Sequence, residues 1–271
     1  MGSALTVAPV AAVIETKGYE AAFLFFGIGQ GLLVMLIAPF LREPSRESTA
    51  SRQTAEERTG SQDYKPLQVL KMPSFWLLYV MMTMMAMGGL MATAQLGPVA
   101  QDFGVANSMI TIAWLSMAAL PFALSLDRIL NGVSRPFWGW VSDRIGRATT
   151  MGIVFSLEAV AIALLILTAG NPGLFVLFSG LTFFGWGEIY ALFPAASTDL
   201  FGTRHAATNY GLLYTAKGTS AFLVPVANII KAHTGSWYGV FAASAVMNFV
   251  VVALALLVLS PLRHRLMLRP A

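Results

Sequence analysis

Apolar residues in this chain fall into long blocks of about 20 residues, separated by shorter polar segments. A block of that length crosses the hydrocarbon core of a bilayer as an α-helix, whereas a transmembrane β-strand alternates over roughly ten residues. The pattern therefore predicts an all-α, polytopic helical membrane protein and excludes a β-barrel. The blocks predict seven spans, at residues 21–41, 76–98, 113–141, 149–169, 173–197, 206–230 and 237–260.

The longest polar segment follows the first predicted span and is rich in Ser, Thr, Glu and Arg. Such a composition predicts a flexible linker, at residues 42–72. Residues 1–41 then hold a partial helix and one span, and residues 73–271 form a six-helix bundle. Six spans after a long loop suggest one half of a two-bundle transporter. Seven spans also fit a receptor-like bundle, although the dominant loop after the first span argues against that alternative.

The first 15 residues are apolar but lack the basic n-region and the cleavage site of a signal peptide. They predict the tail of another span, too short to cross a bilayer alone. The chain then holds the last span of a first half and all of a second half. We therefore expect this polypeptide alone to be incompetent in transport, with a missing N-terminal half as its partner.

The distribution of charge predicts the orientation of the spans. Only 11% of the residues are charged, against about 25% in soluble domains. The pI near 9.5 would suit a nucleic-acid partner, but the basic residues follow the membrane topology instead. Twelve of the 17 Lys and Arg residues fall on one side of the alternating spans: Arg42, Arg46, Arg52, Arg58, Lys65, Lys71, Arg144, Arg147, Arg204, Arg263, Arg265 and Arg269. The other side holds Lys17 and Lys231. By the positive-inside rule the 42–72 linker and the C-terminus are cytoplasmic, and no nucleic-acid partner is expected.

Three basic residues fall inside predicted spans: Arg128, Arg135 and Lys217. A cation at the bilayer centre costs roughly 2.5–3.5 kcal/mol on insertion scales, so it normally faces the bundle interior or a water-filled path. Arg128 and Arg135 lie two turns apart on one helix face, and Tyr210, Tyr214 and Lys217 share a face of another helix. Each cation is a candidate for binding an anion.

Intramembrane acids offer structural alternatives to this interpretation. Arg135 could pair with an acid, and Lys217 could pair with Glu188. Asp127 could neutralise Arg128 or a neighbouring helix. Glu158 and Glu188 are interpreted as protonated or paired structural groups rather than as a proton relay, because Glu188 points about 200° away from Trp186 on its helix.

The segment 139–147 reads GWVSDRIGR and resembles the G-x-x-x-D-R-x-G-R loop of the major facilitator superfamily. The acid ends a helix at the cytoplasmic surface, and the two arginines offer ion-pair partners that can be exchanged as helices rock. The resemblance implies a gating motif made of Gly139, Asp143, Arg144, Gly146 and Arg147. The alternative is an ordinary basic turn that obeys the positive-inside rule.

Three further segments narrow the resemblance: LDRILNGVSRPFWG at 126–139, FGWGEIY at 184–190 and NYGLLYTAKGT at 209–219. They are similar to the oxalate:formate antiporter family, in which an arginine and a lysine hold substrate anions amid aromatic residues. By position the resemblance implies substrate-binding roles for Arg135, Lys217, Trp186 and Tyr190. Arg128 and Tyr214 complete the candidate set, and Tyr214 stands where relatives carry a different aromatic residue, which leaves the substrate open.

The resemblance implies a secondary transporter of small organic mono- or dicarboxylate anions, such as oxalate and formate, that works by alternating access in the bacterial inner membrane. A proton-coupled monocarboxylate carrier and a non-transporting anion-binding receptor stay as alternatives. An enzyme is disfavoured because the three histidines, His205, His233 and His264, lie at loops or ends and no nucleophile–base pair is apparent. The chain has no cysteine and no cluster of metal-ligand residues, so no metal site and no cofactor are expected.

Overall fold

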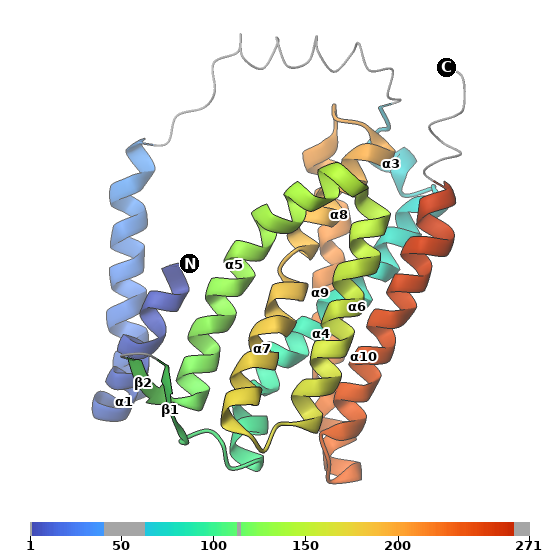
Figure 1. Cartoon of the computed structure of the whole chain (residues 1–271). Coiled ribbons are helices and arrows are strands. Elements are labelled where there is room, and N and C mark those ends of the chain that lie inside the picture. The colour runs from blue at the N-terminus through green and yellow to red at the C-terminus, as the bar shows by residue number, and fades with distance from the viewer. Residues whose placement is uncertain (1, 41–62, 113–114, 263–271) are drawn as a thin grey trace. The chain divides into compact units, whose positions relative to one another are not determined.

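The computed structural model describes residues 2–40, 63–112 and 115–262 (Figure 1). The chain divides into two units, Met1–Ser61 and Gln62–Ala271, which are considered separately. The elements of the second unit are α3 (Pro66–Val69), α4 (Pro73–Asp102), β1 (Met109–Ile112), β2 (Leu115–Ala118), α5 (Ala119–Ile145), α6 (Arg147–Leu167), α7 (Pro172–Trp186), α8 (Ile189–Phe201), α9 (Ala206–Thr234), α10 (Tyr238–Ala253) and the π-helical η2 (Leu254–Leu259).

The first unit consists of the kinked helix α1 (Gly2–Ile37), which continues into a 3₁₀ turn. The kink lies at Gly18, whose φ of 82° and ψ of 166° belong to a region that only glycine adopts readily. Residues 9–40 are long and apolar enough to cross a membrane. The helix after the kink covers the predicted span at 21–41, although its last residue lies outside the described part.

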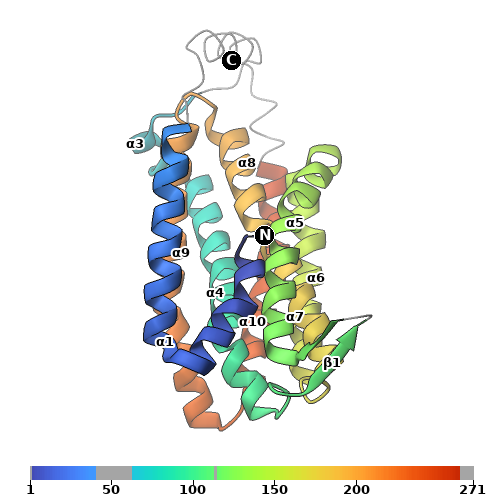
Figure 2. The same ribbon diagram turned by 90° about the vertical axis from the view of Figure 1, so that its left-hand side faces the viewer.

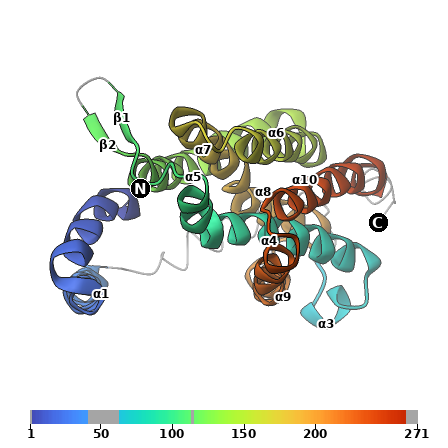
Figure 3. The same cartoon turned by 90° about the horizontal axis from the view of Figure 1, so that it is seen from below.

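The described residues of the second unit form a bundle of six long helical segments: α4, α5, α6, α7 with α8, α9, and α10 with η2. Viewed along the bundle, α4, α9 and α10 gather on one side and α5, α6 and α7 on the other (Figure 3). Four segments of this unit are long and apolar enough to span a membrane. The helices α5 and α9 are long but less apolar, and they carry the three intramembrane cations. The prediction of an all-α polytopic membrane protein is confirmed.

Large apolar side chains fill the interior between these helices. The aromatic rings of Phe155 on α6 and Phe193 on α8 stack with centroids 6.3 Å apart, and both residues are fully buried. Met81, Met82 and Met85 on α4 are also fully buried. Close packing of such side chains stabilises the bundle through dispersion as well as burial.

The predicted span at 113–141 is wrong at both ends. Met109–Ile112 and Leu115–Ala118 form an antiparallel hairpin, and α5 runs from Ala119 to Ile145. Apolar, β-branched residues suit a strand as well as a membrane helix, so hydropathy alone cannot separate them. The hairpin lies at the end of the bundle where α7 begins (Figure 2).

The predicted span at 173–197 is not one continuous helix. It is divided between α7 and α8 at Gly187 and Glu188. A Cβ atom on Gly187 would lie 2.1 Å from Ser134 Oγ and 2.7 Å from the Asn131 carbonyl oxygen, so α5 approaches the backbone here. This close approach requires glycine and accompanies the interruption of the helix.

Polar contacts join the helix ends at the two ends of the bundle. At one end the Tyr64 amide donates to the Phe201 carbonyl at 3.0 Å, so the described residues before α4 pack on the α8–α9 turn. At the other end Lys231 Nζ lies 2.6 Å from Asp102 Oδ2, which also accepts a hydrogen bond from Trp237 Nε1 at 2.8 Å. Residues 41–62 of the predicted linker and the basic tail from 263 lie outside the described residues.

Candidate functional site

Arg135 and Lys217 converge on one aromatic ring from two different helices. The guanidinium carbon of Arg135, on α5, lies 4.8 Å from the ring centroid of Tyr190, on α8. Lys217 Nζ, on α9, lies 5.1 Å from the same centroid. Both distances fall within the range of cation–π interactions. The bundle therefore holds two cations beside Tyr190, although 82 residues separate them in the sequence.

Aromatic residues extend this site on both sides of Tyr190. The ring of Trp186 meets Tyr190 edge to face, with centroids 5.6 Å apart. Tyr214 lies 6.0 Å from Tyr190 on the other side, and its hydroxyl is 3.4 Å from Lys217 Nζ. Tyr210 contacts Tyr214 at 5.7 Å. The structure thus brings together five of the six predicted substrate-binding residues: Arg135, Lys217, Trp186, Tyr190 and Tyr214.

Neither cation at Tyr190 forms an ion pair with an acid among the described residues. The guanidinium of Arg135 donates to Asn131 Oδ1 at 3.3 Å, which leaves its positive charge unbalanced. Lys217 faces Tyr190 and Tyr214 rather than Glu188. The structure therefore does not contain the acid pairings that were the structural alternatives for Arg135 and Lys217. Two unbalanced cations beside one ring repel each other, and a bound anion would relieve that repulsion.

Arg128 occupies a separate position on α5. Its guanidinium carbon lies 6.0 Å from the ring of Phe183, which in turn meets Trp186 at 5.8 Å. Arg128 therefore lies over Phe183, the ring that contacts Trp186, and does not lie over Tyr190. Its neighbour Asp127 is buried and forms no ion pair within the described residues.

A glycine on α4 sets the position of Trp186. A Cβ atom on Gly89 would lie 2.0 Å from Cε2 and 2.1 Å from Nε1 of the Trp186 indole. The indole therefore packs flat on the backbone of α4, where any side chain would collide with it. The sequence analysis missed Gly89, because its only signal is a pair of adjacent glycines in an apolar helix.

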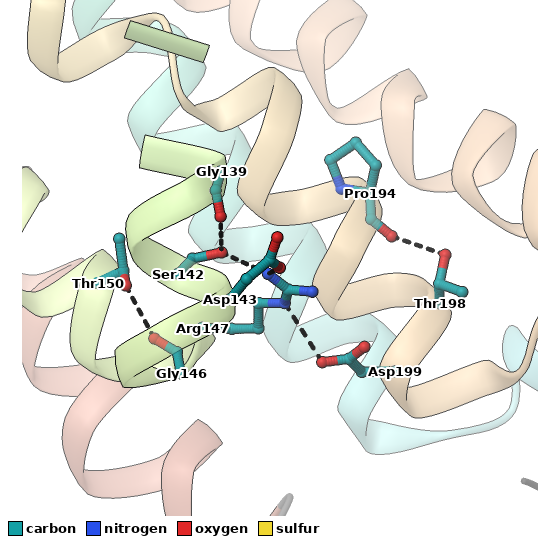
Figure 4. A network of polar contacts seen from close by, with 9 residues as sticks. All are labelled: Gly139, Ser142, Asp143, Gly146, Arg147, Thr150, Pro194, Thr198 and Asp199. Carbon is teal, nitrogen blue, oxygen red and sulfur yellow. Dashed lines mark hydrogen bonds and ion pairs between the residues drawn. The ribbon is translucent and has the colours of Figure 1, made fainter. Parts of the chain in front are cut away.

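The gating motif forms a polar network at the α5–α6 turn (Figure 4). Arg147 pairs with Asp143 at 2.5 Å and with Asp199 of α8 at 3.4 Å, and it also donates to the Ser142 hydroxyl. A cation at a helix N-terminus is disfavoured by the helix dipole, and the two carboxylates offset that cost. Asp199 lies 52 residues beyond Arg147, so sequence spacing gave no signal for it.

The remaining members of the motif have different surroundings. Gly146 has φ 90° and ψ 154°, which only glycine adopts readily, and it links the two helices. Arg144 stacks on the exposed ring of Trp140, with its guanidinium carbon 3.6 Å from the centroid. A Cβ atom on Gly139 would meet no described atom within 4 Å. Within this bundle the motif thus ties α5, α6 and α8 together through Arg147.

Comparisons with known proteins agree with this architecture. The family model of the Major Facilitator Superfamily matches residues 99–268. The chain is 32% identical over 251 residues to the oxalate:formate antiporter of Oxalobacter formigenes, covering 92% of this chain and 57% of that protein. It is 26% identical over 207 residues to the uncharacterized MFS-type transporter YhjX of Escherichia coli, covering 76% and 48%. A shorter match, 35% over 99 residues, covers 36% of this chain and 25% of an uncharacterized 38 kDa protein of Thermoproteus tenax.

The family match, at residues 99–268, extends over α5 to α9, which carry both the cation–aromatic site and the gating motif. The chain spans about half the length of the two longer relatives. Both of those relatives are named as transporters, which supports a role in transport rather than in enzymatic catalysis. The family match, the helical bundle and the GWVSDRIGR turn lead to one assignment. The chain is an integral membrane protein that belongs to the major facilitator superfamily.

Proposed function

We propose that the chain acts in a secondary transporter of small carboxylate anions, with oxalate and formate as the first candidates. The observation that carries this proposal is the convergence of Arg135 and Lys217 on Tyr190 without an acidic partner among the described residues. The similarity to an oxalate:formate antiporter supports the same class of substrate. The membrane is then the bacterial inner membrane, with the C-terminus in the cytoplasm.

Electrostatics favours an anion with two carboxylate groups. Each carboxylate can take charge-assisted hydrogen bonds from one cation, so a dicarboxylate neutralises both. Arg135 offers a planar fork that fits a carboxylate in two-point contact, whereas Lys217 supplies a compact charge. The rings of Trp186, Tyr190 and Tyr214 favour a small, flat ligand beside them. Arg128, against Phe183, stands outside this pair and serves as a control position.

The ion-pair network of Arg147 supports movement as well as binding. Its contacts join α5, α6 and α8 at one end of the bundle, where exchange of partners can accompany rocking of helices during alternating access. A receptor has no need of such a gate. Because the chain spans about half the length of its transporter relatives, we propose that transport requires a complementary half, whereas anion binding can be measured on this chain.

Binding of labelled oxalate to the chain in lipid nanodiscs tests the site. Lys217→Gln and Arg135→Gln should each weaken binding; where the complementary half buries the contact, the loss should reach about 30- to 5,000-fold, since removing one partner of a buried charged contact costs roughly 2–5 kcal/mol. In the chain alone Arg135 is exposed and Lys217 half-buried, so the loss should be smaller. Arg135→Lys should recover little of this loss, because the charge returns without the fork. Arg128→Gln is the matched control and should change oxalate affinity far less. Normal oxalate affinity in both neutral variants would refute the site.

Competition and counterflow separate the alternative functions. Unlabelled formate, lactate and pyruvate compete with labelled oxalate, and a preference for the last two would favour a monocarboxylate carrier. Counterflow is then measured in proteoliposomes that hold the chain together with the remaining helices of a first half. Oxalate binding without counterflow in that assembly would favour an anion-binding receptor.

A further inference from the structure

Two glutamates in the interior of the six-helix bundle are fully buried. Glu158 belongs to α6, and Glu188 occupies the interruption between α7 and α8; both are 0% exposed. Their four carboxyl oxygens make no hydrogen bond of standard geometry within the described residues. A Cβ atom on Gly185, about one helical turn before Glu188, would lie 2.7 Å from Glu158 Cβ, so the segment that leads to Glu188 packs directly on Glu158. Sequence spacing did not predict that these two acids would meet.

Two polar side chains of α10, Ser244 and Asn248, lie close to Glu158. A Cβ atom built on Gly88 of α4 would lie 2.8 Å from Ser244 Oγ, 3.7 Å from Asn248 Oδ1 and 4.0 Å from Glu158 Oε1. Asn248 is fully buried and Ser244 is 3% exposed, and both lack a hydrogen-bond partner of standard geometry for these side-chain atoms. Asn248 acts on the Glu158 carboxyl group, but four buried polar side chains are rarely left with so few hydrogen bonds, so this cluster calls for a ligand. We refer to Glu158, Glu188, Ser244 and Asn248 as the carboxyl cluster.

No basic residue balances the carboxyl cluster within the described part of the bundle. Glu188 and Glu158 are the charged groups that act on each other. The helix α10 contributes Asn248 and Ser244, which do not titrate, and α4 contributes the backbone at Gly88. On α5 and α9 Arg128 lies over Phe183, and Arg135 and Lys217 lie over Tyr190. The other cations of these two helices, Arg144 and Lys231, lie in their last turns. The cluster therefore needs a positive ligand of its own.

Burial of two carboxylates without a cation is too costly to persist. A buried carboxylate without a cation is strongly destabilised, so two neighbouring buried carboxyl groups keep a proton between them and are both ionised only at high pH. We propose that Glu158 and Glu188 form a proton-binding site that holds one exchangeable proton between them. Asn248 and Ser244 then supply hydrogen bonds to the protonated and to the ionised carboxyl group.

This proton site is placed to influence anion binding; this step rests on the proposed function. Glu188 lies two residues from both Trp186 and Tyr190, whose rings border the candidate anion site. At a separation of about 12 Å, roughly the diameter of a helix with its side chains, and an effective dielectric constant of about 20, one negative charge weakens binding of a monoanion about tenfold and of a dianion such as oxalate about 100-fold. Gly88 of α4 packs against the carboxyl cluster, and the adjacent Gly89 packs against the Trp186 indole. Protonation and anion binding should therefore favour each other.

Infrared titration of the chain in nanodiscs tests the proton site without any ligand. We expect a carboxylic-acid C=O band at neutral pH that is lost reversibly as the pH rises. Glu158→Gln should move the titration of the remaining Glu188 to lower pH, because repulsion between the pair is removed. Glu188→Gln should do the same for Glu158, whereas Asp127→Asn, a buried acid outside the pair, should leave both titrations unchanged. Independent titrations of the two glutamates, or a band set by Na⁺ at constant pH, would overturn the shared proton.

Oxalate binding as a function of pH tests the coupling. The dissociation constant of oxalate should rise about 100-fold as the pair loses its shared proton, and this rise should vanish in the Glu158→Gln/Glu188→Gln double variant. Binding that is independent of pH while the infrared pair titrates would refute the coupling. A wild-type chain that binds no oxalate at any pH would refute the proposed function and the coupling together, while the infrared titration decides the proton site separately.

Discussion

Substitution of Gly89 by alanine should disrupt the contact between Trp186 and Tyr190 in the candidate anion site. The new Cβ atom would lie 2.0 Å from Cε2 of Trp186 in the present geometry. Carbon atoms in contact are about 3.5–4.0 Å apart, so the indole or the helix must move by about 1.5 Å. The ring has no flexible end that can yield, and its other side meets Tyr190. The Trp186–Tyr190 contact should therefore be lost or loosened.

Two opposing terms set the size of the effect on stability. Replacing glycine by alanine inside a helix gains about 1 kcal/mol of helix propensity. Overpacking a close-packed interior typically costs about 1–3 kcal/mol. Gly211→Ala on α9 is the matched control, because no described atom lies within 4 Å of its new Cβ atom. Gly89→Ala should therefore be less stable than Gly211→Ala by about 1–3 kcal/mol.

Chemical unfolding of both variants in the same lipid environment measures this difference, and oxalate binding measures the consequence for the site. We expect Gly89→Ala to weaken oxalate binding, while Gly211→Ala retains it. If Gly89→Ala proved as stable as Gly211→Ala and bound oxalate normally, the indole could not be packed against α4 as described.

Two further predictions concern the gating turn and the topology. Gly146→Ala should destabilise the chain by about 1–3 kcal/mol, because a residue with a side chain is strained at φ 90° and ψ 154°. Gly139→Ala, at a helical position of the same motif, should be tolerated, and unfolding measurements compare the two variants. Since the chain has no cysteine, Arg204→Cys and His233→Cys report on opposite ends of α9. An impermeant external thiol reagent should label His233→Cys in intact cells and spare Arg204→Cys, and the reverse pattern would refute the predicted orientation.

The membrane class and most spans could be predicted because they depend on local length and hydropathy. Failures occur where hydropathy cannot distinguish two structures. Residues 109–112 pair with residues 115–118 as strands, where hydropathy predicted the start of a span. The interruption at Gly187 and Glu188 depends on the approach of α5, which no pattern along that segment reveals.

The candidate anion site could be found from the sequence because a cation inside a span is costly wherever it lies. Arg135 and Lys217 therefore stood out before their positions in space were known, and helical periodicity placed Tyr214 on the face of Lys217. That both cations lie over Tyr190 depends on the tertiary packing of the helices. The role of Asp199 depends on it too, because the packing of α8 against α6 decides which acid pairs with Arg147.

Buried acids are harder to interpret from sequence than buried cations, for a physical reason. A lysine or arginine in a bundle keeps its charge in most settings and must face a partner, a ligand or water. A glutamate can become neutral by protonation, so an isolated one is compatible with an ordinary structural role. Whether a buried glutamate has a structural role or binds an exchangeable proton depends on whether a second acid and an amide side chain lie beside it. Glu158 and Glu188 acquire that significance because Gly185, one turn before Glu188, packs on Glu158, and because Asn248 of α10 lies close to Glu158.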